Sequence, residues 1–486
     1  MQRRDFLQLS GLATLGAVVN GCSTTASMPS TNKKIRKTDK KPRVVIVGGG
    51  FAGINTATAI KQNDPKDQIE IILIEKNSHY FACPMSNTLL SGSKEFRKEN
   101  FIFYYFDLQR KYNIELIHTE VLDINREEKV VVCTQEELRY DYLVLAPGIE
   151  YDYKKEFPHW DEMKIRRAKV EAPGGLISDG GVEHANLLAQ LEEFKQNGGE
   201  GEIVIIPQRT NLYQNMQKSI QYKSLVRCAP ASYERACMIA DWIKRNNFVG
   251  KAKVVILDSA LAPQAKASAF MQTFNDLYEG IIEYVSGFNL IDVDFDKKEI
   301  YYKELNEDLD YYKEKRSYSI LNLIPLQKAS GLIKRAALKT NHWGGALLAD
   351  RKLYSVSDSS IYVVGDSAVF TKGYYAQNPK RKGGVPAAAQ TAYNLGKEAG
   401  YMISERILKA KDLDLGRFSA GCFSMVQIDP NKLGISINKK FSFDKKGAMV
   451  IEEEVSYENG KYYNDIAGEG IVDWFNGVTG DTFAKF

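Results

Sequence analysis

The sequence predicts an α/β fold with two Rossmann-like dinucleotide-binding domains and a smaller C-terminal α+β domain. Three observations predict it: a glycine-rich turn between an apolar strand and a helix, a second strand–helix–strand segment in mid-chain, and a late strand and long helix that complete the first domain. The chain has 486 residues, which is enough for two or three domains and a large core.

The first domain starts with an apolar run at 43–47 that enters a Gly-x-Gly-x-x-Gly turn, followed by a predicted helix over 54–61 and a strand over 69–74. The first glycine permits a tight turn, the second lets the backbone approach a pyrophosphate, and the third lets helix and strand pack closely. Glu75 follows the second strand, where an acid binds a ribose. The predicted cofactor-binding residues here are Gly48, Gly50, Phe51, Ala52, Gly53 and Glu75.

Short apolar strands at 114–117, 121–124 and 129–133 predict an antiparallel meander, and the strand after it ends in Ala-Pro-Gly148. Gly148 would let the chain turn sharply beside the cofactor. The second α/β segment begins with the strand 202–207 and includes a helix over 232–244 and a strand over 251–258. No Gly-x-Gly-x-x-Gly follows its first strand, which argues against a nicotinamide substrate.

The chain then returns to the first domain through a strand that ends in Gly365-Asp366 and a long helix over 387–407. We therefore predict a discontinuous first dinucleotide-binding domain at 43–155 and 327–411, which the resemblance stated below implies to be the FAD-binding domain. The second Rossmann-like domain is predicted at 156–326 and a C-terminal domain at 412–486. Residues 1–42 are predicted to be an export signal and a basic linker.

The N-terminus resembles a twin-arginine export signal, with Arg3-Arg4 before an apolar stretch that is too short to span a bilayer. This predicts a periplasmic protein. Gly21-Cys22 resembles a lipoprotein processing site, so Cys22 could carry a lipid anchor; ordinary cleavage near residue 27 is the alternative. Seven of the eleven residues 33–43 are Lys or Arg, which we interpret as a solvated linker. The net charge of +4 gives no argument for nucleic acid as a partner.

Six cysteines are too few for a disulfide-stapled scaffold, and they form neither a C-x-x-C pair nor a C-x-x-C-H haem motif. Cys22 belongs to the signal. Cys133 lies in a predicted strand and Cys237 in the middle of a predicted helix, and we interpret both as small core residues. The cysteines that remain are Cys83, Cys228 and Cys422. No metal site is predicted.

The chain resembles the flavoprotein subunit of flavocytochrome c sulfide dehydrogenase and, more distantly, sulfide:quinone oxidoreductases. The resemblance runs from about residue 43 to 486. It rests on the segments 48–53, 80–87, 146–148, 227–228, 233–236, 322–325, 365–366, 474–476 and 481–483, and on Cys422.

The resemblance implies that Cys83 binds the FAD 8α-methyl carbon covalently and that Asp366, after Gly365, binds the ribityl chain. It implies a redox-active Cys228–Cys422 disulfide that hydrosulfide attacks, leaving a persulfide on one cysteine. Which cysteine carries the persulfide stays open. Arg227 or a helix N-terminus beside Cys228 could lower the thiol pKa. Electrons would pass through FAD to a c-type cytochrome whose haem is on a separate chain.

Two segments depart from the family pattern: an insertion at 208–226 and a basic stretch at 380–386. Two other functions stay open. One is a sulfide:quinone oxidoreductase at the membrane surface, which the weakly amphipathic tail 456–486 disfavours. The other is a non-catalytic flavoprotein assembly subunit, which the retained cysteines and Asp366 disfavour.

Overall fold

A computed structural model describes residues 35–36, 41–175, 180–215, 218–221, 224–264, 266–305, 311–349, 352–370, 387–409, 418–443 and 449–484. The predicted export signal with Cys22 and the basic stretch 380–386 lie outside these residues.

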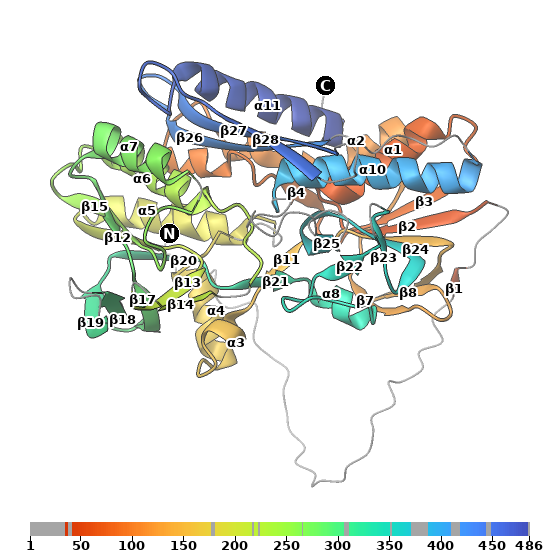
Figure 1. Ribbon diagram of the computed structural model, residues 1–486, viewed down its shortest axis with the longest axis horizontal. Helices are drawn as coiled ribbons and strands as arrows, with labels where there is room; N and C mark the ends of the chain where they lie inside the picture. Colours follow the sequence, from red (N-terminus) through yellow and green to blue (C-terminus); the bar gives the residue numbers. More distant parts are fainter. Residues whose placement is uncertain are drawn as a thin grey trace, which may run out of the picture. The chain divides into compact units, whose positions relative to one another are not determined.

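The first domain is organised around an eight-stranded sheet in the order β25-β22-β23-β24-β10-β2-β3-β6 (Figure 1). The five strands from β24 to β6 are parallel. β2 is buried along its whole length, as expected for a strand of a parallel sheet that is covered on both faces. The strands are β2 (Arg43–Val47), β3 (Glu70–Ile74), β6 (Glu115–Ile117), β10 (Tyr142–Leu145), β22 (Ala346–Leu348), β23 (Tyr354–Ser355), β24 (Asp358–Val363) and β25 (Ala368–Phe370).

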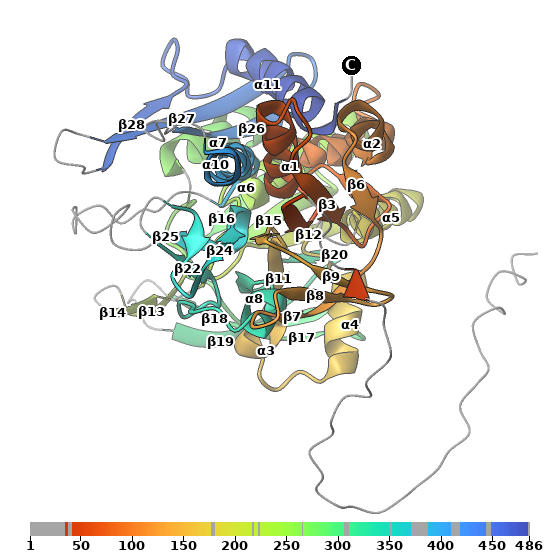
Figure 2. The same ribbon diagram turned by 90° about the vertical axis from the view of Figure 1, so that its right-hand side faces the viewer.

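Helices α1 (Phe51–Asn63) and α10 (Ala389–Leu408) lie side by side on one face of this sheet (Figure 2). Two glycines of α10 permit the close approach. A Cβ on Gly400 would meet the Cβ of Ala59 at 2.6 Å, and a Cβ on Gly396 would collide with the Ala52 carbonyl oxygen. The late helix predicted from the sequence therefore packs directly on the helix of the glycine-rich turn.

The second sheet is parallel in the order β16-β15-β12-β20. Its strands are β12 (Gly201–Ile206), β15 (Ala252–Leu257), β16 (Ile282–Val285) and β20 (Ile320–Leu323). Its helices are α5 (Val182–Gln196), α6 (Ala231–Arg245) and α7 (Ala267–Tyr278). The insertion at 208–226 contains an antiparallel hairpin of β13 (Asn211–Asn215) and β14 (Lys218–Gln221).

Smaller sheets surround these two. The predicted meander is wrong for its first strand: residues 115–117 form β6 at the edge of the first sheet, parallel to β3, while the strands at 121–124 and 129–133 do pair antiparallel in a sheet of order β1-β9-β8-β7. Two further pairs, β11·β21 and β4·β5, and a three-stranded sheet of β17, β18 and β19 are separate from both parallel sheets. These strands are β1 (Ile35–Arg36), β4 (His79–Phe81), β5 (Ile102–Tyr104), β7 (Val121–Asn125), β8 (Val130–Cys133), β9 (Glu137–Arg139), β11 (Ile149–Tyr151), β17 (Asn289–Asp294), β18 (Glu299–Leu305), β19 (Tyr311–Ser317) and β21 (Gln327–Ala329). The short helices are η1 (Ser86–Ser91), η2 (Lys98–Phe101), η3 (Gly365–Ser367), α2 (Phe106–Tyr112), α3 (Tyr153–Glu156), α4 (Glu162–Glu171) and α8 (Gly331–Arg335).

The C-terminal part is an antiparallel sheet of β26 (Phe418–Gln427), β27 (Leu433–Phe443) and β28 (Met449–Val455) with the helix α11 (Asp465–Phe483) packed on it. A Cβ on Gly468 would collide with the Lys432 carbonyl oxygen, so the helix backbone lies against the start of β27. Among the described helices, none combines the length and the apolar character that crossing a membrane requires.

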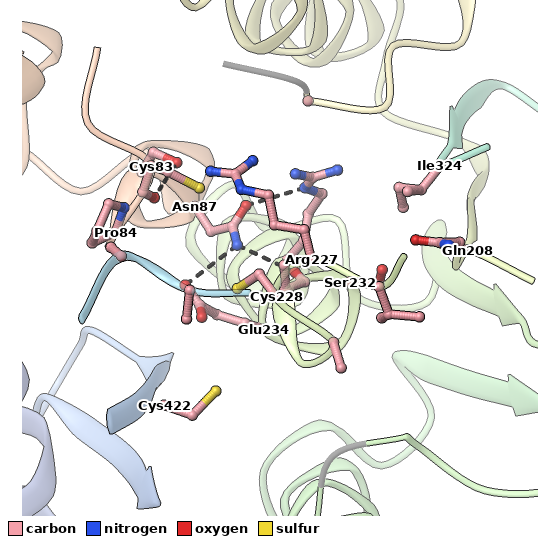
Figure 3. Close-up of a pocket in the computed structure, with 18 of the residues that line it drawn as sticks. Cys83, Pro84, Asn87, Gln208, Arg227, Cys228, Ser232, Glu234, Ile324 and Cys422 are labelled. Atoms are coloured by element: carbon pink, nitrogen blue, oxygen red, sulfur yellow. Dashed lines mark hydrogen bonds between the residues drawn. The ribbon is translucent and has the colours of Figure 1, made fainter. Parts of the chain in front are cut away.

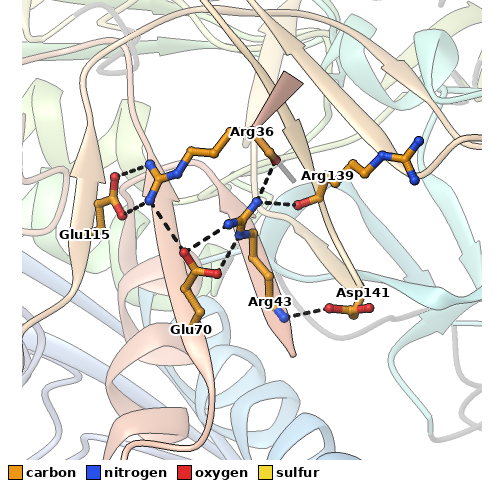
Figure 4. Close-up of polar contacts among 6 residues, drawn as sticks. All are labelled: Arg36, Arg43, Glu70, Glu115, Arg139 and Asp141. Carbon is orange, nitrogen blue, oxygen red and sulfur yellow. Dashed lines mark hydrogen bonds and ion pairs between the residues drawn. The ribbon is translucent and has the colours of Figure 1, made fainter. Parts of the chain in front are cut away.

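The interpretation of residues 33–43 as a solvated linker is wrong for two of its arginines (Figure 4). Arg36 forms β1 with Ile35 and binds Glu115 and Glu70. Arg43 is only 1% exposed, and its Nε lies 2.7 Å from the Glu70 carboxylate. Arg43 is held against the first domain because a buried guanidinium requires a carboxylate partner, and Arg36, whose side chain is 37% exposed, pairs with the same carboxylate.

Candidate functional site

The glycine-rich turn has the backbone that its sequence predicts. Gly48 has a φ of +111°, and its N–H donates to the Ile74 carbonyl at 2.9 Å. A Cβ on Gly53 would collide with the Gly48 carbonyl oxygen, which explains why α1 can pack so near the strand. Beside Gly50 the space is open, since a Cβ there would meet only Tyr80, at 3.7 Å. An anion can therefore approach the N-terminus of α1.

Glu75 stands at the end of β3 beside this turn. Its carboxylate accepts hydrogen bonds from the Gly49 N–H at 2.8 Å and from the Asn77 N–H at 2.9 Å. These two bonds hold the acid at the edge of the turn, where a ribose would follow a pyrophosphate.

A cavity of about 300 Å³ extends from the turn across the carboxyl ends of the parallel strands. It brings together most of the predicted cofactor residues: Gly48, Gly50, Phe51, Ala52, Glu75, Gly148, Gly365 and Asp366. The N-terminal residues Ala389 and Ala392 of α10 also line it, so the positive end of that helix faces the cavity. These residues fit the adenine dinucleotide part and the ribityl chain of FAD. Gly53 contributes through helix packing and does not line the cavity.

Several residues that line this cavity were not predicted to bind the cofactor. Lys76, Asn77 and Tyr80 follow Glu75 closely, and the glycine fingerprint could have suggested them. Others come from elements that the fingerprint does not include: Thr119, Val121, Glu150, Arg227 and Arg335.

A second cavity of about 110 Å³ is lined by Cys83, Cys228 and Cys422 (Figure 3). Cys83 lies between β4 and η1, Cys228 precedes α6, and Cys422 lies in β26. We call this cavity the thiol pocket. Three segments that are far apart in the chain therefore present their thiols to one space. No disulfide joins these cysteines in the structure, so the Cys228–Cys422 pairing stays a prediction.

The backbone around Cys228 is held in an unusual conformation. Cys228 has a φ of +51°, which a non-glycine residue adopts rarely. Its N–H donates to the Ala387 carbonyl at 3.1 Å, and its carbonyl accepts from the Ala231 N–H at 3.0 Å. These bonds fix Cys228 between the segment that enters α10 and the first turn of α6. Strained residues that the surroundings hold in place occur often at functional sites.

Arg227 connects the two cavities, because it lines both. Its Nε lies 3.1 Å from the Asp366 carboxylate, and neither side chain is more than 22% exposed. The acid predicted to bind the cofactor is thus paired with the residue that precedes Cys228. Burial raises the pKa of Asp366, and Arg227 opposes that effect.

Arg227 lowers the thiol pKa of Cys228, as expected, but the expected net lowering of that pKa is wrong. Burial is the largest effect and raises the pKa of Cys228 well above the usual value; Cys422 and Cys83 add to the rise, and Arg227 only reduces it. Burial also raises the pKa of Cys422 to about 12. Both thiols therefore keep their protons at neutral pH in this structure.

Glu234, on α6, is a polar residue of the thiol pocket that was not predicted to be a site residue. It is 5% exposed, and burial raises its pKa to about 8. Asn87 donates to its carboxyl group at 3.3 Å and accepts from Arg235 at 3.1 Å. A carboxyl group that titrates near neutral pH beside two cysteines can exchange protons with them. The local sequence carries no sign of this pKa, because burial alone causes it.

The corresponding site in the second domain is closed by tyrosines. Asp258 follows β15 as Glu75 follows β3, but it is completely buried. Its carboxylate accepts from the Tyr233 hydroxyl at 2.6 Å and the Tyr284 hydroxyl at 3.0 Å. The acid that would bind a second ribose is therefore occupied, and β12 leads to Pro207 and Gln208 in place of a glycine-rich turn.

Two families match parts of the chain. Residues 219–325 match the central region of the sulfide dehydrogenase (flavocytochrome c) flavoprotein chain, and residues 42–164 match the pyridine nucleotide-disulphide oxidoreductases. The first match covers Cys228, Glu234 and Asp258, and the second covers the glycine-rich turn and Cys83.

Two curated relatives match the chain over short segments. A NADH oxidase of Methanocaldococcus jannaschii is 31% identical over 115 residues, which is 22% of this chain and 25% of that protein. A type II NADH:quinone oxidoreductase of Staphylococcus haemolyticus is 29% identical over 112 residues, or 23% of this chain and 27% of that protein. The matched segment thus spans about a quarter of these relatives.

Solved structures show the same fold over most of the chain. The sulfide:quinone oxidoreductase of Aquifex aeolicus has a TM-score of 0.65 at 16% identity and covers 91% of this chain and 92% of its own. A NAD-dependent persulfide reductase of A. fulgidus has a TM-score of 0.56 at 16% identity, with 90% and 77% covered. The fold is therefore that of flavoproteins with two dinucleotide-binding domains, extended by a C-terminal antiparallel sheet.

Proposed function

Because the chain carries the central region of the flavocytochrome c sulfide dehydrogenase flavoprotein family, we propose that it is an FAD-dependent dehydrogenase that oxidises hydrosulfide. One observation carries this proposal. Cys83, Cys228 and Cys422 come from three distant segments and line one pocket, and Arg227 joins this pocket to the dinucleotide cavity.

FAD, when bound along the first cavity, supplies the two-electron acceptor. Gly48, Gly50 and Glu75 would hold its adenine dinucleotide part, and Asp366 its ribityl chain. Cys83 is suited to form the covalent bond with the flavin. Tyr80 lines the dinucleotide cavity, and Cys83, three residues later in the chain, lines the thiol pocket. This covalent bond would keep FAD from being lost after the protein has left the cytoplasm.

The oxidised enzyme would contain a Cys228–Cys422 disulfide. Hydrosulfide attacks one sulfur, the S–S bond breaks, one cysteine becomes a persulfide, and the other leaves as a thiolate. The thiolate takes a proton, because burial raises the pKa of both thiols. Glu234 is protonated at neutral pH and can supply this proton. Arg235 fixes Asn87, and Asn87 in turn orients the Glu234 carboxyl group.

The partner and location belong to the same proposal. A c-type cytochrome on a separate chain would accept the electrons, since this sequence has no C-x-x-C-H motif. The twin-arginine signal would place the folded flavoprotein in the periplasm, with lipid at Cys22 as an additional anchor. The occupied Asp258 argues against NADH as the reductant.

Acid precipitation of the purified holoprotein, followed by mass spectrometry of the Cys83 peptide, tests the cofactor assignment. We expect flavin on that peptide, and free flavin from the Cys83→Ser protein. Anaerobic addition of sulfide should bleach the flavin absorbance, and added cytochrome c should restore it. A holoprotein whose flavin absorbance does not respond to sulfide would refute the proposed function.

The quinone-reducing alternative is tested in the same preparation. Decylubiquinone should reoxidise the sulfide-reduced flavin much more slowly than cytochrome c does. Faster reoxidation by the quinone would assign the protein to the sulfide:quinone oxidoreductase function. The persistence of sulfide bleaching in either case excludes the non-catalytic assembly subunit.

A further inference from the structure

Two arginines and one glutamate are the charged residues that line the thiol pocket: Arg227, Arg235 and Glu234. Arg227 already has a counter-charge, because its Nε lies 3.1 Å from the Asp366 carboxylate. Burial raises the pKa of Glu234 to about 8, so its carboxyl group is neutral at neutral pH. The charge of Arg235 is therefore not balanced by another residue of the pocket lining.

Arg235, on α6, is buried among neutral acceptors. The residue is 5% exposed, and it forms no ion pair with a carboxylate of the described residues. Its Nε donates to Asn87 Oδ1 at 3.1 Å, and its Nη1 donates to Asn322 Oδ1 at 2.7 Å and to the Gly174 carbonyl at 2.9 Å. Burial lowers the pKa of Arg235, but a guanidinium stays protonated in proteins. A buried cation without a carboxylate favours an anionic ligand.

The remaining guanidinium nitrogen of Arg235, Nη2, is available for such a ligand. It donates to none of the described residues, and it is not one of the polar atoms that the protein encloses completely. The wall beside it is formed by glycine, because a Cβ on Gly175 would lie 2.4 Å from Nη2. Gly174 and Gly175 both line the pocket and leave room at this nitrogen. Its N–H groups can therefore bind a small anion.

Other titratable groups face Arg235 from the elements packed around it: Tyr151 on β11, Cys83, Glu234 on α6, and Glu183 and His184 on α5. Burial raises the pKa of Tyr151 well above its usual value. Burial and Arg235 lower the pKa of His184 to about 3, so both side chains are neutral. Glu183 supplies a carboxylate, but that group accepts from the Gly175 N–H at 3.0 Å and does not line the pocket. The positive charge of Arg235 is therefore left to act on a ligand.

We propose that Arg235 binds the substrate anion and makes the thiol pocket selective for hydrosulfide over neutral hydrogen sulfide. The proposal rests on the proposed function, which supplies the substrate. Because the contact consists of a charge and N–H donors, other monovalent anions with a single heavy atom should compete for it. The charged form of Glu234, the neighbouring residue on α6, should weaken the binding of any of these anions.

Anaerobic stopped-flow bleaching of the holoprotein at a series of sulfide concentrations gives an apparent Kd and a limiting rate. Arg235→Gln removes the charge and keeps a donor, and it should raise the apparent Kd about 10- to 100-fold, the effect of charge-assisted hydrogen bonds. Arg235→Lys keeps the charge and should recover part of this loss. Arg110→Gln removes the same charge from an exposed position on α2 and should behave as the wild type. A lower limiting rate with an unchanged Kd in Arg235→Gln would limit Arg235 to positioning Asn87 and overturn the proposal.

The pH dependence separates anion binding from a structural role of Arg235. In the wild type, the apparent Kd for total sulfide should rise about tenfold per pH unit below the pKa of hydrogen sulfide, because only the anion binds. In Arg235→Gln this dependence should move to the limiting rate, since a pocket without the charge no longer distinguishes the two forms. A wild-type apparent Kd that does not change with pH would overturn the proposal.

Bromide tests the site in the wild-type protein, so the result does not depend on the folding of a variant. Bromide has a single heavy atom and does not reduce flavin. It should raise the apparent Kd for sulfide competitively and leave the limiting rate unchanged. Gluconate, a much larger anion at the same ionic strength, should have little effect. Equal effects of the two salts would overturn the anion site and leave the proposed function standing. Absence of sulfide bleaching in the wild-type protein would overturn both proposals.

Discussion

Arg227 and Asp366 form an ion pair at 3.1 Å that joins the predicted cofactor site to the thiol pocket. Replacing Arg227 by methionine should leave Asp366 buried without its counter-charge, at a cost of about 1–3 kcal/mol. Since Arg227 lowers the pKa of Asp366, its loss should also keep the acid neutral to higher pH. We expect a lower melting temperature and weaker FAD retention, most evident as the pH falls. Arg227→Lys keeps the charge and should lose less; equal behaviour of the two variants and the wild type would contradict this role.

Cys228→Ser should bind FAD but fail to bleach when sulfide is added, with a rate at least about a thousandfold lower, because the exchange step needs both sulfurs. Stopped-flow absorbance measures this rate. Cys237→Ser is the matched control, since Cys237 lies on α6 and is completely buried but does not line the pocket. That protein should bleach at the wild-type rate. Wild-type bleaching by Cys228→Ser would remove disulfide exchange from the mechanism.

The raised pKa of Glu234 leads us to expect that the rate of the sulfide reaction depends on pH. Its pKa is raised by burial to about 8, so the carboxyl group is neutral below that pH and charged above it. The charge then raises the pKa of both Cys228 and Cys422 and repels hydrosulfide. The bleaching rate should fall above pH 8, approaching tenfold per pH unit. Glu234→Gln should be slower at pH 7 and lack this fall; an unchanged profile would assign the fall to another group.

The hydrogen bonds of Asp258 lead us to expect that NADH does not reduce this flavoprotein. Its carboxylate is already bound by Tyr233 and Tyr284, so it cannot accept hydrogen bonds from a ribose. Millimolar NADH or NADPH under anaerobic conditions should leave the flavin spectrum unchanged over minutes, while sulfide added afterwards bleaches it. Reduction by either nucleotide would show that the second domain binds dinucleotides in another way.

Two glycine substitutions should have opposite effects on stability, because Gly400 lies in the contact between α10 and α1 and Gly477 has open space beside it. Gly400→Ala would place a Cβ 2.7 Å from the Thr56 carbonyl oxygen and should destabilise the protein by about 1–3 kcal/mol. Gly477→Ala, in α11, meets nothing within 4 Å and should stabilise it by about 0.5–1 kcal/mol. Thermal unfolding of the two proteins measures both effects. A stabilised Gly400→Ala protein would show that the helices are less closely packed.

The local elements were largely predictable from the sequence, because they follow from short-range patterns. The buried run of β2 and the glycines after it predicted the strand and the turn, and the helix begins at Phe51, slightly before the predicted start. The helix α11 was not predicted. Four glycines, at 468, 470, 477 and 480, weaken its helical signal, and its stability depends on packing against β27.

The sequence by itself determined the strands β2, β3, β12 and β15 of the two parallel sheets, the glycine-rich turn with Glu75, and the choice of three cysteines. Short-range periodicity and residue type are sufficient for those features. Only the tertiary structure decided that Cys83, Cys228 and Cys422 line one pocket, that Glu234 titrates near pH 8, and that tyrosines occupy Asp258. These properties arise from burial and from contacts between residues far apart in the chain, and no local pattern encodes either.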